Sequence, residues 1–182
     1  MITAFVGAAQ GPWQINTINE VAGPGLAQAG ALQVLPLSSP QAELPVGAWT
    51  VLGTPSNLRY TNRQEQQQLA HYLTPTDVPT HSQAAFIPIQ KSDAWWALAQ
   101  DERRRIMAET SKHIEIGLPY TEFIYRKLYH CRDLMQPYDF VTWFEFAPAS
   151  VGLFNELVAR LRATEEWTYV VRETDVRLSR VI

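Results

Sequence analysis

Histidine is the first residue type to consider, because imidazole is a common metal ligand and proton carrier. The chain has four histidines: His71, His81, His113 and His130. No two of them have zinc-site spacing, and a single cysteine cannot complete such a site. His113 follows Ile106 and Ala99 at intervals of seven residues, about two helical turns each. On that apolar helix face, His113 is either a core histidine or a metal ligand, and the pattern leaves both readings open.

Arg126 is the second candidate for chemistry. In the strand-like segment Phe123–Cys131, it alternates with Ile124 and Leu128 on one predicted face. A guanidinium keeps its charge and is costly to bury without a partner. Arg126 is therefore either an edge-strand arginine that reaches solvent or a glutamate, or an anion-binding charge inside an apolar cavity.

Two residue pairs add weaker signals. Glu165-Glu166 follow a predicted helix, at the end where acidic side chains oppose the helix dipole. This placement indicates either a cationic partner or a tolerated surface pair. Trp95-Trp96 fit core or interface packing, and flat aromatic walls also suit a flat cofactor.

The elements that must position these residues change character along the chain. In the first half, three short apolar runs flanked by Gly and Pro predict strands: Ile2–Ala8, Leu32–Leu37 and Ala48–Gly53. The Gln-rich segment Asn62–Leu73 is predicted as a short helix, and Thr74–His81 as a loop.

The second half is more regular. Ala84–Ile89 is a predicted strand, after which Ser92 is a candidate N-cap for a helix that runs to about His113. Further strands are predicted at Phe123–Cys131, Phe140–Phe146 and Tyr169–Val181. A second helix follows Pro148, with Val151, Phe154, Leu157, Val158 and Leu161 on one face.

This order, β-α-β-β-α-β from residue 84, is the ferredoxin-like pattern. The first half resembles a shortened version of it. We therefore expect an α+β protein with one domain, 1–182, made of two ferredoxin-like halves, 1–83 and 84–182. Joined sheets would form a dimeric α+β barrel, with a cavity between sheet and helices.

Composition excludes several classes of function. The chain has 182 residues, is 46% hydrophobic and has a net charge of −3, so it can bury a core and lacks the basic character typical of nucleic-acid binders. Residues 103–105, a run of three arginines, are expected to form a solvated helix face. Residues 1–30 show no leader pattern, and no apolar run has the length of a membrane helix, which favours the cytoplasm.

Several blocks, in the right order, resemble the chlorite dismutase family. They are Ile87-Pro88-Ile89-Gln90-Lys91-Ser92-Asp93-Ala94-Trp95-Trp96, Asp101-Glu102-Arg103-Arg104, Ser111-Lys112-His113, Leu128-Tyr129-His130-Cys131-Arg132-Asp133, Phe140-Val141-Thr142-Trp143-Phe144-Glu145 and Leu161–Tyr169. The resemblance is close over about residues 84–182 and loose before them. The short length is similar to that of the dimeric branch, which implies a homodimer.

The resemblance implies a site as well as a fold. It implies one haem b per chain, with His113 as the iron ligand and Glu166 as acceptor for the other ring nitrogen. Lys91 and Trp95 would lie near the haem and its propionates, with Asn57 and Tyr60 as weaker candidates for propionate contacts. Arg126 would be the distal arginine that binds chlorite, and it would retain hypochlorite until dioxygen and chloride form.

Three alternatives remain at this stage. Coproheme decarboxylase shares the superfamily and the proximal half but lacks the distal arginine, so Arg126 discriminates against it. A haem-binding or haem-transfer protein without turnover would need only His113. A cofactor-free ferredoxin-like interaction domain would need neither residue. The physiological substrate is open from sequence alone.

Overall fold

The computed structural model describes residues 1–39, 42–56, 63 and 80–181. The first half contains β1 (Ile2–Ala8), β2 (Trp13–Ala22), β3 (Ala31–Leu37) and β4 (Trp49–Pro55). Three of these confirm predicted strands, with slightly shifted bounds. The strand β2 was missed, because its exposed Asn, Thr and Glu residues hide its periodicity. Apart from Arg63, the helix predicted at Asn62–Leu73 lies outside the described residues, as does most of the loop at Thr74–His81.

The second half supplies the helices. Its elements are β5 (Gln83–Lys91), α2 (Asp93–Ala97), α3 (Gln100–Arg105), the π-helix η2 (Ile106–Thr110), α4 (His113–Gly117), η3 (Leu118–Tyr120), β6 (Ile124–His130), η4 (Arg132–Leu134), β7 (Phe140–Phe146), η5 (Pro148–Ser150), α5 (Val151–Arg162), η6 (Glu165–Tyr169) and β8 (Val170–Arg180). The order of strands and helices confirms the ferredoxin-like prediction. Within the described ranges, no helix is long and apolar enough to cross a membrane.

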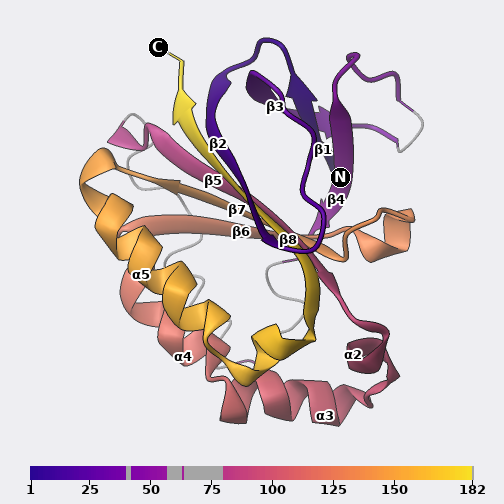
Figure 1. The fold of residues 1–182 in the computed structure, drawn as a ribbon, viewed down its shortest axis with the longest axis vertical. Coiled ribbons are helices and arrows are strands. Elements are labelled where there is room, and N and C mark those ends of the chain that lie inside the picture. Colours follow the sequence, from indigo (N-terminus) through magenta and orange to yellow (C-terminus); the bar gives the residue numbers. More distant parts are fainter. Residues whose placement is uncertain (40–41, 57–62, 64–79, 182) are drawn as a thin grey trace.

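Eight strands close into an antiparallel barrel. Around it, the first half contributes β4-β1-β3-β2 and the second half β8-β5-β7-β6, so both halves follow the same strand order. The halves join at two seams, β2 with β8 and β4 with β6. Figure 1 shows the barrel in the upper part of the molecule, with α3, α4 and α5 along its lower and left side.

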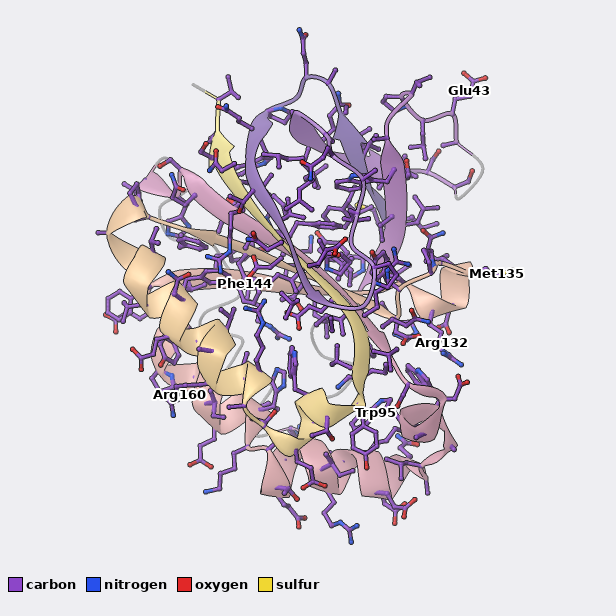
Figure 2. All side chains as sticks on the ribbon, in the orientation of Figure 1. Glu43, Trp95, Arg132, Met135, Phe144 and Arg160 are labelled. Atoms are coloured by element: carbon purple, nitrogen blue, oxygen red, sulfur yellow. The ribbon has the colours of Figure 1, made fainter. Side chains whose placement is uncertain are left out.

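Strand alternation separates two cores. Inward residues from both halves fill the barrel, where the rings of Phe5 and Phe86 lie 4.9 Å apart between centroids. On the outer face of the second half, Ala85, Ile87 and Phe144 pack against α5. The predicted apolar face of α5 is confirmed, since Phe154, Leu157, Val158 and Leu161 are buried and Val151 packs against the same cluster. Figure 2 places Phe144 between the sheet and α5.

Candidate functional site

A cavity of about 580 Å³ lies between the outer face of the second-half sheet and the helices that connect β5 to β6. Ile89, Leu128 and Thr142 line it from the sheet, and Trp95 and Met107 line it from the helices. Its volume falls within the range of about 300–1,000 Å³ that is typical of ligand and cofactor sites.

His113 enters this cavity from a break in the helical segment. Helix α3 passes into the π-helix η2, and Lys112 then takes a left-handed conformation with a φ of 49°. His113 therefore begins α4, and the prediction that it ends one long helix is wrong. The predicted stripe is wrong in part for the same reason, because Ile106 is buried but Ala99 is exposed. Functional sites often contain such π-helical turns.

Glu166 fixes the orientation of the imidazole. Its Oε2 lies 2.8 Å from Nδ1 of His113, its Oε1 accepts a hydrogen bond from Lys91 Nζ at 2.9 Å, and its backbone N–H donates to Ser111 Oγ at 2.9 Å. Burial alone raises the pKa of Glu166, but His113 and Lys91 outweigh it and lower the pKa to about 2. An ionised carboxylate favours the tautomer with its proton on Nδ1. The lone pair of Nε2 is then available, and Nε2 has no hydrogen-bond partner in the described part of the chain.

Aromatic rings lie next to His113 and Lys91, the two side chains that contact the Glu166 carboxylate. The ring of Trp167 is roughly parallel to that of His113, with centroids 6.2 Å apart, and its Nε1 donates to Glu173 Oε2 at 2.7 Å. The Lys91 ammonium lies 4.4 Å from the ring centroid of Trp95, which is itself buried. Burial lowers the pKa of Lys91, although Glu166 opposes this effect. Lys91 and Trp95 therefore lie beside His113 and Glu166, and their expected contacts with a haem stay a prediction.

Arg126 reaches the same cavity from the sheet. The predicted alternation of β6 places Arg126, Leu128 and His130 on the cavity wall. Burial lowers the pKa of the Arg126 guanidinium, an effect that the charge of Glu166 partly offsets, yet an arginine remains protonated. Among the described residues, Arg126 has no ion pair and no hydrogen bond to its side chain. An unpaired cation in a largely apolar cavity is a site for an anion.

Sequence reasoning missed several wall residues. Arg103 and Arg104 are half-buried and line the cavity, so the expectation of a solvated face holds only for the exposed Arg105. Asp139, which is not among the wall residues but binds two of them, was also missed. Its buried carboxylate accepts hydrogen bonds from three separate segments, and no local pattern predicts such convergence. Asn57 and Tyr60 lie outside the described residues.

The residues fit a haem. An imidazole with one nitrogen held by a carboxylate and the other without a partner is the usual arrangement of a protein ligand to haem iron. Buried Trp95 and half-buried Trp96 provide flat apolar walls beside it. The guanidinium of Arg126 provides one anion-binding group on the sheet side of the same space.

Comparison with known proteins agrees with this geometry. The sequence model of the family described as Chlorite dismutase matches residues 38–182. The chlorite dismutase of Ideonella dechloratans is 31% identical over 127 residues, which cover 68% of this chain but only 42% of that protein. This chain thus spans less than half the length of that curated relative.

Solved structures extend the match to the whole chain. A dimeric chlorite dismutase from Nitrobacter winogradskyi is 44% identical, covers 98% of this chain and 99% of its own, and superposes with a TM-score of 0.91. A mutant chlorite dismutase from Candidatus Nitrospira defluvii is 27% identical, covers 74% of this chain and 56% of its own, and gives a TM-score of 0.60. With the family match covering most of its length, the chain belongs to the chlorite dismutase family.

Proposed function

We propose that this protein is a haem b enzyme that converts chlorite to chloride and dioxygen, with His113 Nε2 as the iron ligand. One observation carries the proposal: the Arg126 guanidinium, without a partner among the described residues, lines the same cavity as an imidazole whose Nε2 is available. Chlorite contains one chlorine and two oxygen atoms and carries one negative charge. Chloride and dioxygen account for all of them, so no second substrate is required.

In this proposal, residues on the helix side of the cavity hold the haem and orient its ligand His113. Haem, when bound, supplies the redox chemistry that breaks the oxygen–chlorine bond. Glu166 keeps the proton on Nδ1 and makes the imidazole of His113 a stronger donor. Lys91 pairs with the other oxygen of Glu166, so the buried carboxylate keeps its charge.

The sheet side has an anion-handling role. Arg126 attracts chlorite into a poorly hydrated space, where a fixed charge acts strongly. Its planar fork orients the anion and keeps the anionic chlorine fragment in the cavity while the two oxygen atoms combine. Retention matters because an escaping hypochlorite would damage the protein.

The test is oxygen release from chlorite, measured with an electrode on the haem-loaded protein. Arg126→Ala should lower kcat/KM about 100- to 1,000-fold, the usual cost of losing one preorganised charge-stabilising group. Lys127→Ala is the matched control, because Lys127 is adjacent on β6 but extends over the Tyr129 ring, away from the cavity. Near-wild-type turnover in Arg126→Ala would refute the role of Arg126. A haem-loaded wild type that releases no oxygen would refute the proposed activity and leave a haem carrier.

We also propose a homodimer in the cytoplasm. The dimeric Nitrobacter protein, 44% identical over 98% of this chain, supports the assembly state. Light scattering coupled to gel filtration tests it, and a mass of about 21 kDa, that of one chain, would contradict it. The cytoplasmic location and the division at residue 83 remain predictions.

A further inference from the structure

A second group of cations lines the cavity, apart from Arg126. Arg103 and Arg104 of helix α3 and Arg132 of η4 belong to its wall, and we call these three residues the cationic rim. The Arg132 side chain is 48% exposed, so the rim lies at the solvent end of the cavity. This concentration of positive charge occurs in a chain whose net charge is −3.

Trp96 holds two members of the rim in place. The guanidinium carbon of Arg132 lies 4.2 Å from the ring centroid of Trp96, and that of Arg103 lies 5.3 Å from it. Guanidinium groups bind aromatic faces without losing their charge or their outward N–H donors. The indole therefore gathers two cations that would otherwise repel each other.

A buried carboxylate organises this arrangement. Asp139 is only 4% exposed, and it accepts hydrogen bonds from Arg132 Nη1 at 3.0 Å, Trp96 Nε1 at 3.2 Å and the backbone N–H of Lys91 at 2.7 Å. Asp139 thus balances Arg132. Arg103, in contrast, has no ion pair and no side-chain hydrogen bond within the described ranges. The rim keeps a preorganised, uncompensated guanidinium.

We propose that Arg103 and Arg132, held on Trp96, form an oxyanion subsite at the solvent end of the cavity. Two sources share this ligand chemistry: a carboxylate at the edge of the bound cofactor, and a small monovalent oxyanion on its way to Arg126. The second source rests on the proposed function, because it makes the rim a capture site for substrate. In either case the rim attracts negative charge, so its effect falls with ionic strength.

Ligand association with the ferric haem-loaded protein tests the free-anion source without turnover. The probe is nitrite, a small monovalent oxyanion, followed by stopped-flow absorbance at the Soret band. Arg103→Gln and Arg132→Gln should each slow association about 3- to 10-fold at low ionic strength, and the difference should vanish at high salt. Arg103→Lys should lie between wild type and Arg103→Gln. Hydrogen cyanide, neutral near pH 7, should bind all variants alike.

Haem release from the loaded protein tests the cofactor source. If the rim holds a cofactor carboxylate, Arg103→Gln should release haem about 10-fold faster than wild type but leave the affinity for haem dimethyl ester unchanged. Arg105→Gln is the matched control for both experiments, because it removes the same charge from the same helix at an exposed position outside the cavity wall.

Either positive result supports the subsite and identifies its source. The proposal is overturned if both rim variants match Arg105→Gln in nitrite association and in haem release. These readouts do not depend on oxygen production. If the haem-loaded protein does not decompose chlorite, the proposed function is refuted, but nitrite association and haem release still test the cationic rim.

Discussion

The two halves of the barrel share a strand order but differ in what covers their outer faces. In the first half, only the short connection 9–12 separates β1 from β2, and the outer residues Ala4, Val6 and Ala8 pack beneath Leu44 and Leu134. In the second half, the connection from β5 to β6 carries α2, α3, η2, α4 and η3, and α5 connects β7 to β8.

This contrast indicates that the sheet alone does not form the cavity. β1 and β5 hold equivalent places in their halves, and each contributes an inward phenylalanine to the barrel. Only β5 is followed by helices that stand off from the sheet and leave a cavity. The proposed site therefore depends on the connecting segments, which bring His113 and Glu166 to the same cavity as Arg126 of β6.

The largest expected effect is the loss of haem ligation when the histidine of the second half, His113, is removed, but not when His81 of the first half is removed. His113→Ala should abolish the Soret band of histidine-ligated haem while far-ultraviolet circular dichroism stays unchanged, because the proposed role of the ring is ligation and the residue is only half-buried. His81→Ala, at the end of the first half, is the control and should bind haem normally. Wild-type haem binding by His113→Ala would place the ligand elsewhere.

A pair of core truncations compares the halves directly. Phe154→Ala removes a fully buried ring between α5 and the sheet and should cost about 3–5 kcal/mol of unfolding free energy. Leu52→Ala, on the outer face of the first half, should cost about 2 kcal/mol. Denaturant unfolding measures both. Only Phe154→Ala should also speed haem release, and equal release rates would show that the helical layer does not support the cavity.

Glu166→Gln tests how strongly the carboxylate charge beside the His113 imidazole affects haem binding and the iron reduction potential. The variant keeps the shape but leaves Lys91 without its buried partner, and it weakens the donor strength of His113. Haem should dissociate about 10- to 100-fold faster, and the iron reduction potential should rise because ferric iron is less stabilised. Spectroelectrochemistry and haem transfer measure the two effects. Glu165→Gln, the exposed neighbour, should show neither.

The smallest expected effect depends on pH. Burial alone raises the pKa of Asp175, but Arg177 and Arg162 outweigh it, so its pKa lies below the usual value. The stabilisation is therefore complete above the ordinary carboxyl pKa of about 4 and is lost as pH falls through the lowered value. Asp175→Asn should cost about 1.5 kcal/mol at pH 7 and progressively less below about pH 4. A pH-independent difference in unfolding free energy would contradict the ion-pair origin.

Regular periodicity made part of this structure predictable. Alternation placed Arg126 and Leu128 on one face of β6, and helical spacing placed Phe154 and Leu157 on the buried face of α5, because both patterns are local. Ser92 was identified as a helix cap for the same reason, and its Oγ accepts the N–H of Trp95 at 3.3 Å.

Other features required long-range information. A lysine gives no local sign of a left-handed turn, so the break at Lys112 was read as continuous helix. Glu166 showed only an unfavourable position near a helix end, and its partners Lys91 and His113 lie 75 and 53 residues away. Arg103 looked like surface charge because the strand residues that complete the cavity wall beside it are distant in the sequence.

The seam between β2 and β8 is long, and this has a consequence for dividing the molecule. β2 and β8 pair from Trp13–Arg180 to Ala22–Glu173, whereas the described part of the β4–β6 seam consists of the pairs Thr54–His130 and Pro55–Tyr129 and a hydrogen bond from the Ser56 N–H to the Leu128 carbonyl. Cutting the chain between the halves would leave unpaired backbone amides along β2 and β8. Such exposed strand edges promote non-native strand pairing and precipitation. We therefore expect each half to depend on the other for solubility, and neither to fold as a module on its own.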